Sequence, residues 1–184
     1  MIRRSVLGLA LAGAAGPAYA QFDTMTQRPI VKAVREGDEE KVRQALLKGE
    51  NPNQVDSSGR PLLMIAVMDG QVAVVEALLK GGSVVDAVDR EGYTSLIRAA
   101  ERGDYDIVDI LLKRNARPSS QTRQGVTPLM VAARLGHAEI VRLLLDRKAD
   151  PNVPDFTGRT ALTYARQNNR ASIMALLRKA GARE

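Results

Sequence analysis

The side chains that most often carry out catalysis are scarce in this chain. His137 is the only histidine among 184 residues, and there is no cysteine. Nucleophilic and general acid–base catalysis commonly use these residue types, and zinc sites are built mainly from them. A Ser-His-Asp triad would have to include His137. We therefore expect no enzymatic activity, no catalytic residue, no metal site and no cofactor.

Aspartate recurs in a pattern that indicates turns. Asp56, Asp89 and Asp155 each open a short turn sequence, as in DSSG at residues 56–59. Because the aspartates recur with the turn, we interpret them as hairpin-forming residues and not as a paired acid and base. The glycine pair in GGS at residues 81–83 follows a helical pattern, so it indicates a helix end instead of a phosphate-binding loop.

Every turn sequence also carries one arginine, and two turns carry an aromatic ring. The arginines are Arg60, Arg90, Arg123 and Arg159, and the rings are Tyr93 and Phe156. Arginine and aromatic side chains are the usual anchors of protein interfaces. The arginines are open to two interpretations, namely a solvated edge or a surface that binds an acidic partner.

The turns belong to a pattern that repeats every 33 residues. Four sets of residues keep this step: Gly59, Gly92, Gly125 and Gly158; Gly37, Gly70, Gly103 and Gly136; Ala33, Ala66, Ala99, Ala132 and Ala165; Leu46, Leu79, Leu112 and Leu145. Residues 125–152, GVTPLMVAARLGHAEIVRLLLDRKADPN, add a T-P-L-x-x-A-A core. With this period and core the chain resembles the ankyrin repeat, over about residues 26–181.

The resemblance implies an all-α ankyrin-repeat solenoid of about five helix-turn-helix repeats with short β-hairpin or turn fingers. The expected repeats are residues 26–55, 56–88, 89–121, 122–154 and 155–184, after an N-terminal tail at 21–25. Leu129, Ala132 and Ala133 lie at i, i+3 and i+4, so they should form one buried helix face. Arg178 stands where the other repeats have leucine, which predicts a charged, solvent-facing end to the fifth repeat.

Each outer helix is expected to end at a residue with a left-handed backbone. Gly82 has this place after the predicted helix at residues 72–80, while Asn115 and Lys148 replace glycine in the next two repeats. Asn tolerates the left-handed region, whereas Lys148 should strain the backbone.

The chain departs from the T-P-L-H signature of the family. The histidine position holds Met64, Ile97, Met130 and Thr163, so we expect apolar packing where the family forms hydrogen bonds. Arg98 lies at a largely apolar position of an inner helix. Its head could extend to solvent, or it could anchor a partner or a neighbouring acid such as Glu101. His137 follows Gly136, where the family commonly has Gly-His, and this implies a structural role.

In ankyrin arrays the hairpin tips and the exposed side of the inner helices form a concave binding face. Mapped onto this sequence, the candidate residues are Arg60, Met68, Arg90, Tyr93, Arg102, Arg123, Arg134, Leu135, Phe156 and Arg159. We expect a non-enzymatic module that binds a protein partner with an acidic surface, and we expect it to be monomeric. The alternative is a cell-envelope protein whose arginines hold an anionic polymer or lipid headgroups.

Residues 1–20 have the features of a signal peptide. Arg3 and Arg4 precede an apolar run at residues 6–15, and AYA at 18–20 predicts cleavage after Ala20. The run is shorter than the ~20 apolar residues that span a bilayer, so stable membrane insertion is not expected, although an uncleaved anchor is the alternative. The paired arginines leave both ordinary secretion and twin-arginine export open.

Export predicts a periplasmic or secreted protein. After cleavage the chain would keep 25 basic and 21 acidic residues. This mild excess is not the clustered basic charge of a nucleic-acid-binding protein, so no nucleic-acid partner is expected. Without cysteine, the fold in an oxidising compartment would depend on packing between repeats.

Overall fold

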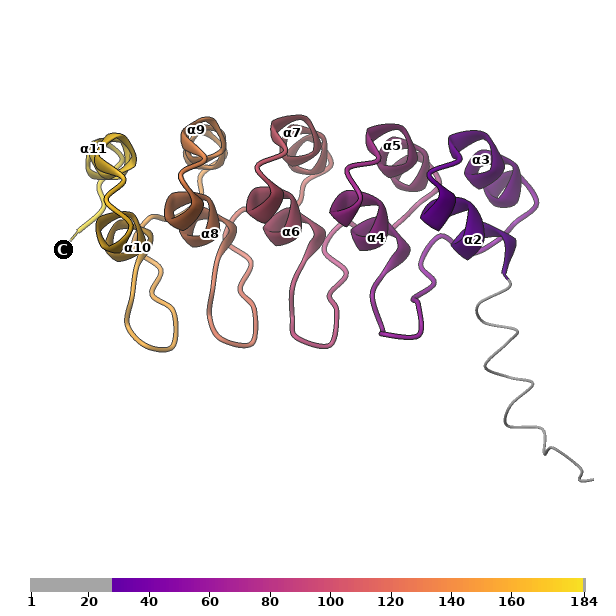
Figure 1. The fold of residues 1–184 in the computed structure, drawn as a ribbon, viewed down its shortest axis with the longest axis horizontal. Helices are drawn as coiled ribbons and strands as arrows, with labels where there is room; N and C mark the ends of the chain where they lie inside the picture. The colour runs from indigo at the N-terminus through magenta and orange to yellow at the C-terminus, as the bar shows by residue number, and fades with distance from the viewer. Residues whose placement is uncertain (1–27, 184) are drawn as a thin grey trace, which may run out of the picture.

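The computed structural model describes residues 28–183, which form a row of five helix pairs (Figure 1). The inner helices are α2 (Pro29–Glu36), α4 (Leu62–Met68), α6 (Ser95–Arg102), α8 (Pro128–Leu135) and α10 (Ala161–Gln167). The outer helices are α3 (Glu39–Leu47), α5 (Val72–Lys80), α7 (Tyr105–Lys113), α9 (Ala138–Asp146) and α11 (Ala171–Lys179). The predicted all-α solenoid is therefore confirmed. The predicted signal peptide and the tail at 21–25 lie outside the described residues.

The loops before α4, α6, α8 and α10 project from the same side of the row as narrow fingers (Figure 1). Isolated antiparallel bridges close two of them, between Val55 and Pro61 and between Val88 and Thr94. No other strand pairing occurs within residues 28–183. The fingers are therefore turns with minimal β structure, as the resemblance implies.

Helix starts follow from capping residues at fixed places in the repeat. The hydroxyls of Thr94, Thr127 and Thr160 accept hydrogen bonds from the third N–H of α6, α8 and α10, at 3.3, 3.2 and 3.4 Å. Such caps satisfy N–H groups that have no partner inside the helix. Pro29 and Pro128 lie in the first helical turn, where a missing N–H costs nothing.

The core is a continuous layer between the inner and outer helices. Leu129, Ala132 and Ala133 of α8 are at most 1% exposed, and Leu144 of α9 is fully buried. Each inner helix packs on the next inner helix, and each outer helix on the next outer one. The small alanines permit this close approach. The predicted apolar face is confirmed.

In the second, third and fourth repeats, two glycines lie where the next repeat packs closely on them. A Cβ at Gly103 would lie 2.5 Å from the His137 ring, and one at Gly125 would lie 2.9 Å from the backbone nitrogen of Phe156. In the fifth repeat a Cβ at Gly158 would meet nothing within 4 Å, and Asn169 replaces glycine with φ 54°. Stacking therefore imposes the requirement for glycine, and this requirement is absent in the fifth repeat, where no further repeat follows in the described chain.

The outer-helix ends have the predicted left-handed backbone. φ is 90° at Gly82, 62° at Asn115 and 66° at Lys148. A Cβ at Gly82 would meet nothing within 4 Å, so a side chain fits at this position and only the backbone angle disfavours it. Arg178 is exposed on α11, as expected of a charged end.

Polar side chains that the sequence analysis missed connect successive repeats. One residue per repeat accepts a hydrogen bond from a backbone N–H 31 residues later: Asn53 from Val84 (2.7 Å), Asp86 from Arg117 (3.1 Å), Ser119 from Asp150 (3.0 Å) and Asn152 from Arg183 (2.8 Å). Meanwhile Met64, Ile97 and Met130 are buried where the family signature has histidine, as predicted for apolar packing. At Thr163 the prediction is wrong, because the Thr163 hydroxyl accepts a hydrogen bond from the Thr160 N–H at 3.4 Å.

Candidate binding surface

Two cavities open where the fingers meet the inner helices. The first has a volume of about 310 Å³ and is lined by Ser58, Arg60, Met68, Asp89, Arg90, Glu91 and Arg98. The second has a volume of about 70 Å³ and is lined by Tyr93, Glu101, Val126, Met130, Val131, Arg134 and Tyr164. The structure therefore brings five of the ten candidate residues into two hollows of one concave face.

The other five candidates lie around these hollows without lining them. Phe156 is 74% exposed and Leu135 is 37% exposed. Arg102 and Arg123 are exposed, and Arg159 is partly buried. The concave face thus has an apolar part, formed by exposed Phe156 and Leu135, in addition to its arginines.

The recurring aspartates shape the fingers, as predicted. Oδ1 of each accepts two backbone N–H groups at 2.9 Å: Asp56 from Ser58 and Arg60, Asp89 from Glu91 and Tyr93, and Asp155 from Thr157 and Arg159. In the fourth repeat the hydroxyl of Thr122 accepts the equivalent bonds from Gln124 and Val126, both at 3.2 Å. The turn therefore requires an acceptor at this position but not a charge.

Two of the four finger arginines bind these aspartates within the chain. Arg60 Nη2 lies 2.8 Å from Asp56 Oδ2, and Arg159 Nε lies 3.1 Å from Asp155 Oδ2. Burial tends to raise the pKa of Asp56, but hydrogen bonds from the backbone and guanidinium of Arg60 outweigh it and hold the pKa below its usual value. Arg60 and Arg159 therefore stabilise their own fingers.

The remaining finger arginines pack across the preceding finger. Arg90 Nη2 donates to the carbonyl of Ser57 at 3.4 Å, and its stem covers Gly59. The backbone N–H of Arg123 donates to the carbonyl of Glu91 at 3.1 Å, which leaves the guanidinium outside this contact. The four arginines are therefore not equivalent, although each turn sequence has one.

Arg98 is engaged by its own repeat. Its guanidinium lies 3.6 Å from the centre of the Tyr93 ring and binds Asp89 Oδ2 at 3.2 Å and Glu101 Oε2 at 3.1 Å. The Nε atom is buried without a hydrogen-bond partner. Arg98 was predicted either to extend its head to solvent or to anchor a partner or a neighbouring acid. The structure agrees with the second interpretation, because Arg98 binds Glu101. One face of Tyr93 is consequently covered by Arg98.

Tyr164 is a further residue of the concave face that the candidate set missed. Its hydroxyl donates to Asp155 Oδ2 at 2.7 Å, and the Arg159 guanidinium lies 4.8 Å from the ring centre. Burial, followed by the bond to Asp155, raises the pKa of Tyr164. Arg98, Val131 and Tyr164 share one place in the 33-residue period, which is the signal that marks this position as facing the finger.

His137 lies at a contact between two successive repeats. The His137 ring packs on Gly103 of the preceding repeat, which agrees with a structural role. Within residues 28–183 no group of three or more His, Cys, Asp or Glu side chains is placed to hold a metal ion.

In the same part of the chain, no helix is long and apolar enough to cross a membrane.

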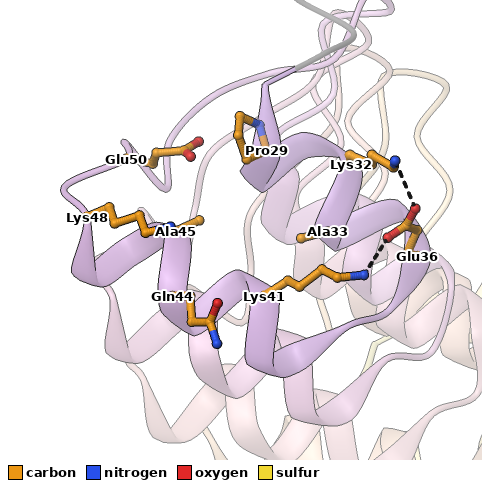
Figure 2. Close-up of a pocket in the computed structure, with 9 residues that line it drawn as sticks. All are labelled: Pro29, Lys32, Ala33, Glu36, Lys41, Gln44, Ala45, Lys48 and Glu50. Atoms are coloured by element: carbon orange, nitrogen blue, oxygen red, sulfur yellow. Dashed lines mark hydrogen bonds and ion pairs between the residues drawn. The ribbon is translucent and has the colours of Figure 1, made fainter.

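A third cavity, of about 290 Å³, lies on the outward side of the first helix pair (Figure 2). Ala33 and Ala45 form its apolar part, while charged side chains surround it. The Glu36 carboxylate lies 3.7 Å from Lys32 Nζ and 3.3 Å from Lys41 Nζ. This face carries mutually paired charges, as suits a first repeat that has solvent on its outer side.

Stacked helix pairs with fingers projecting to one side define a helical repeat protein, in which the concave side is an extended surface for recognition. The family model described as "Ankyrin repeats (3 copies)" matches residues 30–122 and residues 114–183, and the chain belongs to the ankyrin-repeat family. Ankyrin repeats are generally protein–protein interaction modules, and the family is typically non-enzymatic. A comparison with curated proteins gave no match.

Proposed function

We propose that this protein is a non-enzymatic binding module that recognises another protein through its concave face. The observation that carries the proposal is the pair of hollows formed jointly by fingers and inner helices, and the exposed side chains of Leu135 and Phe156 support it. Exposed aromatic and aliphatic side chains next to arginines are typical of interface anchors. We propose that the protein binds as a monomer.

The test is a variant of the concave face compared with a matched variant of the outer helices. Phe156→Ala with Arg134→Gln removes one exposed ring and one exposed charge from the concave face. Tyr105→Ala with Arg142→Gln removes the same kinds of group from α7 and α9, where Tyr105 is 46% exposed. Crosslinking in the native host, followed by mass spectrometry, should show partners that the first variant loses and the second keeps. Equal capture by both variants would exclude the concave face.

The design avoids Arg60 and Arg159 because each holds its own finger. Loss of binding after their replacement could arise from a disordered turn. Circular dichroism of both variants should match the unaltered protein, which separates a lost contact from lost structure.

We also propose that residues 1–20 direct export and are removed, which would place the protein in the periplasm or outside the cell. The charged start, the apolar run and the AYA sequence support this proposal. The measurement is the intact mass of protein recovered from fractionated cells. A periplasmic or secreted species that begins at Gln21 is expected, and a cytoplasmic species that retains residues 1–20 would overturn the proposal.

A further inference from the structure

Charge is divided unevenly along the array. The predicted first three repeats, residues 26–121, contain 14 basic and 15 acidic residues, whereas residues 122–184 contain 11 basic and five acidic residues. The net charge is therefore −1 for the first part and +6 for the second. A charge difference of this size between two parts of the array favours a partner with the complementary pattern.

In the first three repeats the concave arginines already have partners in the chain. Arg35 lies 3.6 Å from Asp56, and Arg98 binds Asp89 and Glu101. Arg102 Nη1 donates to the carbonyl of Met68 at 2.7 Å. These guanidinium groups are largely satisfied, so they offer little to a ligand.

In the fourth repeat the concave arginines lack such partners. Among residues 28–183, no carboxylate lies within ion-pair distance of the Arg123 or Arg134 guanidinium, and both residues are exposed. The acids of this repeat lie elsewhere: Glu139 binds Arg142 on α9, and Asp150 binds the backbone of Asn152. The Arg123 and Arg134 guanidinium groups therefore lack an ion-pair partner in this part of the chain, and Glu101, which lines the same hollow as Arg134, is taken up by Arg98.

Arg134 lines the small cavity, and Val126 of the same repeat lies at its finger side. Val126 has the position that Arg60, Tyr93 and Arg159 occupy in the other fingers. It lines a hollow of about 70 Å³ together with Tyr93, Met130, Val131 and Tyr164, and with the charged residues Arg134 and Glu101. The Glu101 carboxylate is already bound by Arg98 at 3.1 Å. A hollow with apolar walls on one side and the exposed Arg134 on the other fits an aliphatic side chain that has a carboxylate next to it.

We propose that the partner presents an acidic linear segment to the fourth finger, with an aliphatic side chain in the Val126 hollow and carboxylates bound by Arg123 and Arg134. This inference rests on the proposed function and names the chemistry of the partner. The carboxylate oxygens would form charge-assisted hydrogen bonds that guanidinium groups favour. The first cavity, lined by paired charges, would contribute less to affinity.

The probe is a displayed library of random 12-residue peptides, selected against the purified protein. Selected peptides should be rich in Asp and Glu around a Leu, Ile or Val. Their affinity should fall about tenfold for Arg134→Gln and for Arg123→Gln, because each variant removes one charge-assisted contact. Arg142→Gln on α9 is the matched control and should leave affinity unchanged.

Val126→Tyr tests the hollow separately. Tyrosine occurs naturally at this repeat position as Tyr93, so the finger should fold while the ring fills the hollow. Affinity for the selected peptides should fall at least tenfold with no change in the unfolding midpoint. Unchanged affinity would overturn the placement of the aliphatic side chain.

The remaining outcomes separate this inference from the proposed function. Selected peptides without acidic residues, or insensitive to Arg134→Gln, would overturn the inference, while their loss on Phe156→Ala would leave the concave face in place as the binding surface. Enrichment of no peptide would exclude a linear segment but would not affect capture of a folded partner by crosslinking. Inorganic polyphosphate or phosphatidylglycerol vesicles that bind as tightly, and equally well to Val126→Tyr, would show an anionic polymer or lipid ligand instead.

Discussion

The second and fourth repeats build the same finger with different chemistry. In the second, Asp56 accepts the turn N–H groups and also binds the Arg60 side chain. In the fourth, Thr122 accepts the same N–H groups, and Val126 replaces the arginine. The turn backbone is preserved because an oxygen acceptor suffices, whereas the charge is dispensable. The residue at the position of Arg60 and Val126 can thus vary without loss of the finger, and this is where the two fingers differ in chemistry.

The largest predicted effect tests whether the two repeats share one core. Leu78→Ala and Leu144→Ala each remove a fully buried side chain at the same repeat position. Each should lower the free energy of unfolding by about 2–5 kcal/mol, because apolar burial is lost and a cavity remains. Urea denaturation measures the loss. If the difference between the two losses is larger than the width of this range, the two repeats differ in their packing as well as in their fingers.

A smaller effect is expected at the turn acceptors. Asp155→Asn in the fifth finger, which is built like the second, removes the charge that Arg159 and the Tyr164 hydroxyl contact. We expect a loss of about 1–3 kcal/mol, since buried polar groups lose their partner. Thr122→Ala, which disrupts no ion pair, should cost about 1 kcal/mol. Equal losses in urea unfolding would contradict the distinction between charged and neutral fingers.

The charged fingers should also respond to acid. At Asp155, burial alone would raise the pKa, but hydrogen bonds from the Thr157 hydroxyl, the Arg159 N–H and the Tyr164 hydroxyl hold it far below its usual value. A carboxyl whose folded pKa lies below the unfolded value of about 3.9 stabilises the fold above that pH and loses this contribution as the pH falls. The melting temperature should therefore decrease below about pH 4.

The matched variant for this pH series is Asp56→Asn with Asp155→Asn. Its melting temperature should be lower at neutral pH and should change less between pH 5 and pH 3. Asp38 and Asp109 also have lowered pKa values, so part of the slope will persist. A pH dependence identical to that of the unaltered protein would contradict the account of the fingers.

The smallest effect concerns the outer-helix ends, where the second repeat has Gly82 and the fourth has Lys148. Both adopt positive φ, at 90° and 66°. Lys148→Gly should therefore stabilise the protein by about 0.5–1 kcal/mol, because glycine has no Cβ to disfavour this conformation. Thermal unfolding provides the measurement. Gly82→Lys is the reciprocal variant, and it should lose a similar amount.

Most of the fold could be predicted from the sequence because stacking imposes the same requirement every 33 residues. Gly103 and Gly125 recur because the next repeat occupies the space that a Cβ would need, and Leu144 recurs because its position is buried. Such requirements make the same residue types recur every 33 residues in the sequence. The hydrogen bonds of Asn53 and Ser119 were missed because different polar residues perform the same task at that position.

The candidate surface could be predicted only in part. The resemblance to ankyrin repeats implied the concave face, and five of the candidates mapped from it line two hollows. It could not reveal that Arg60 is bound by Asp56, since an ion pair depends on side-chain conformation within the folded turn. Nor could it reveal the hollow at Val126, which involves Tyr164 of the next repeat.

The central claim is that a protein partner occupies the concave face, and position-specific photocrosslinking in living cells tests it most directly. A photoreactive amino acid would replace Leu135 on the concave side, or Tyr105 on the outer helix α7, in otherwise identical proteins. Both side chains are exposed, at 37% and 46%, so both sites can report a bound neighbour. We predict a discrete crosslinked protein from position 135 and none from position 105. Crosslinking from position 105 alone, or equally from both, would contradict the account.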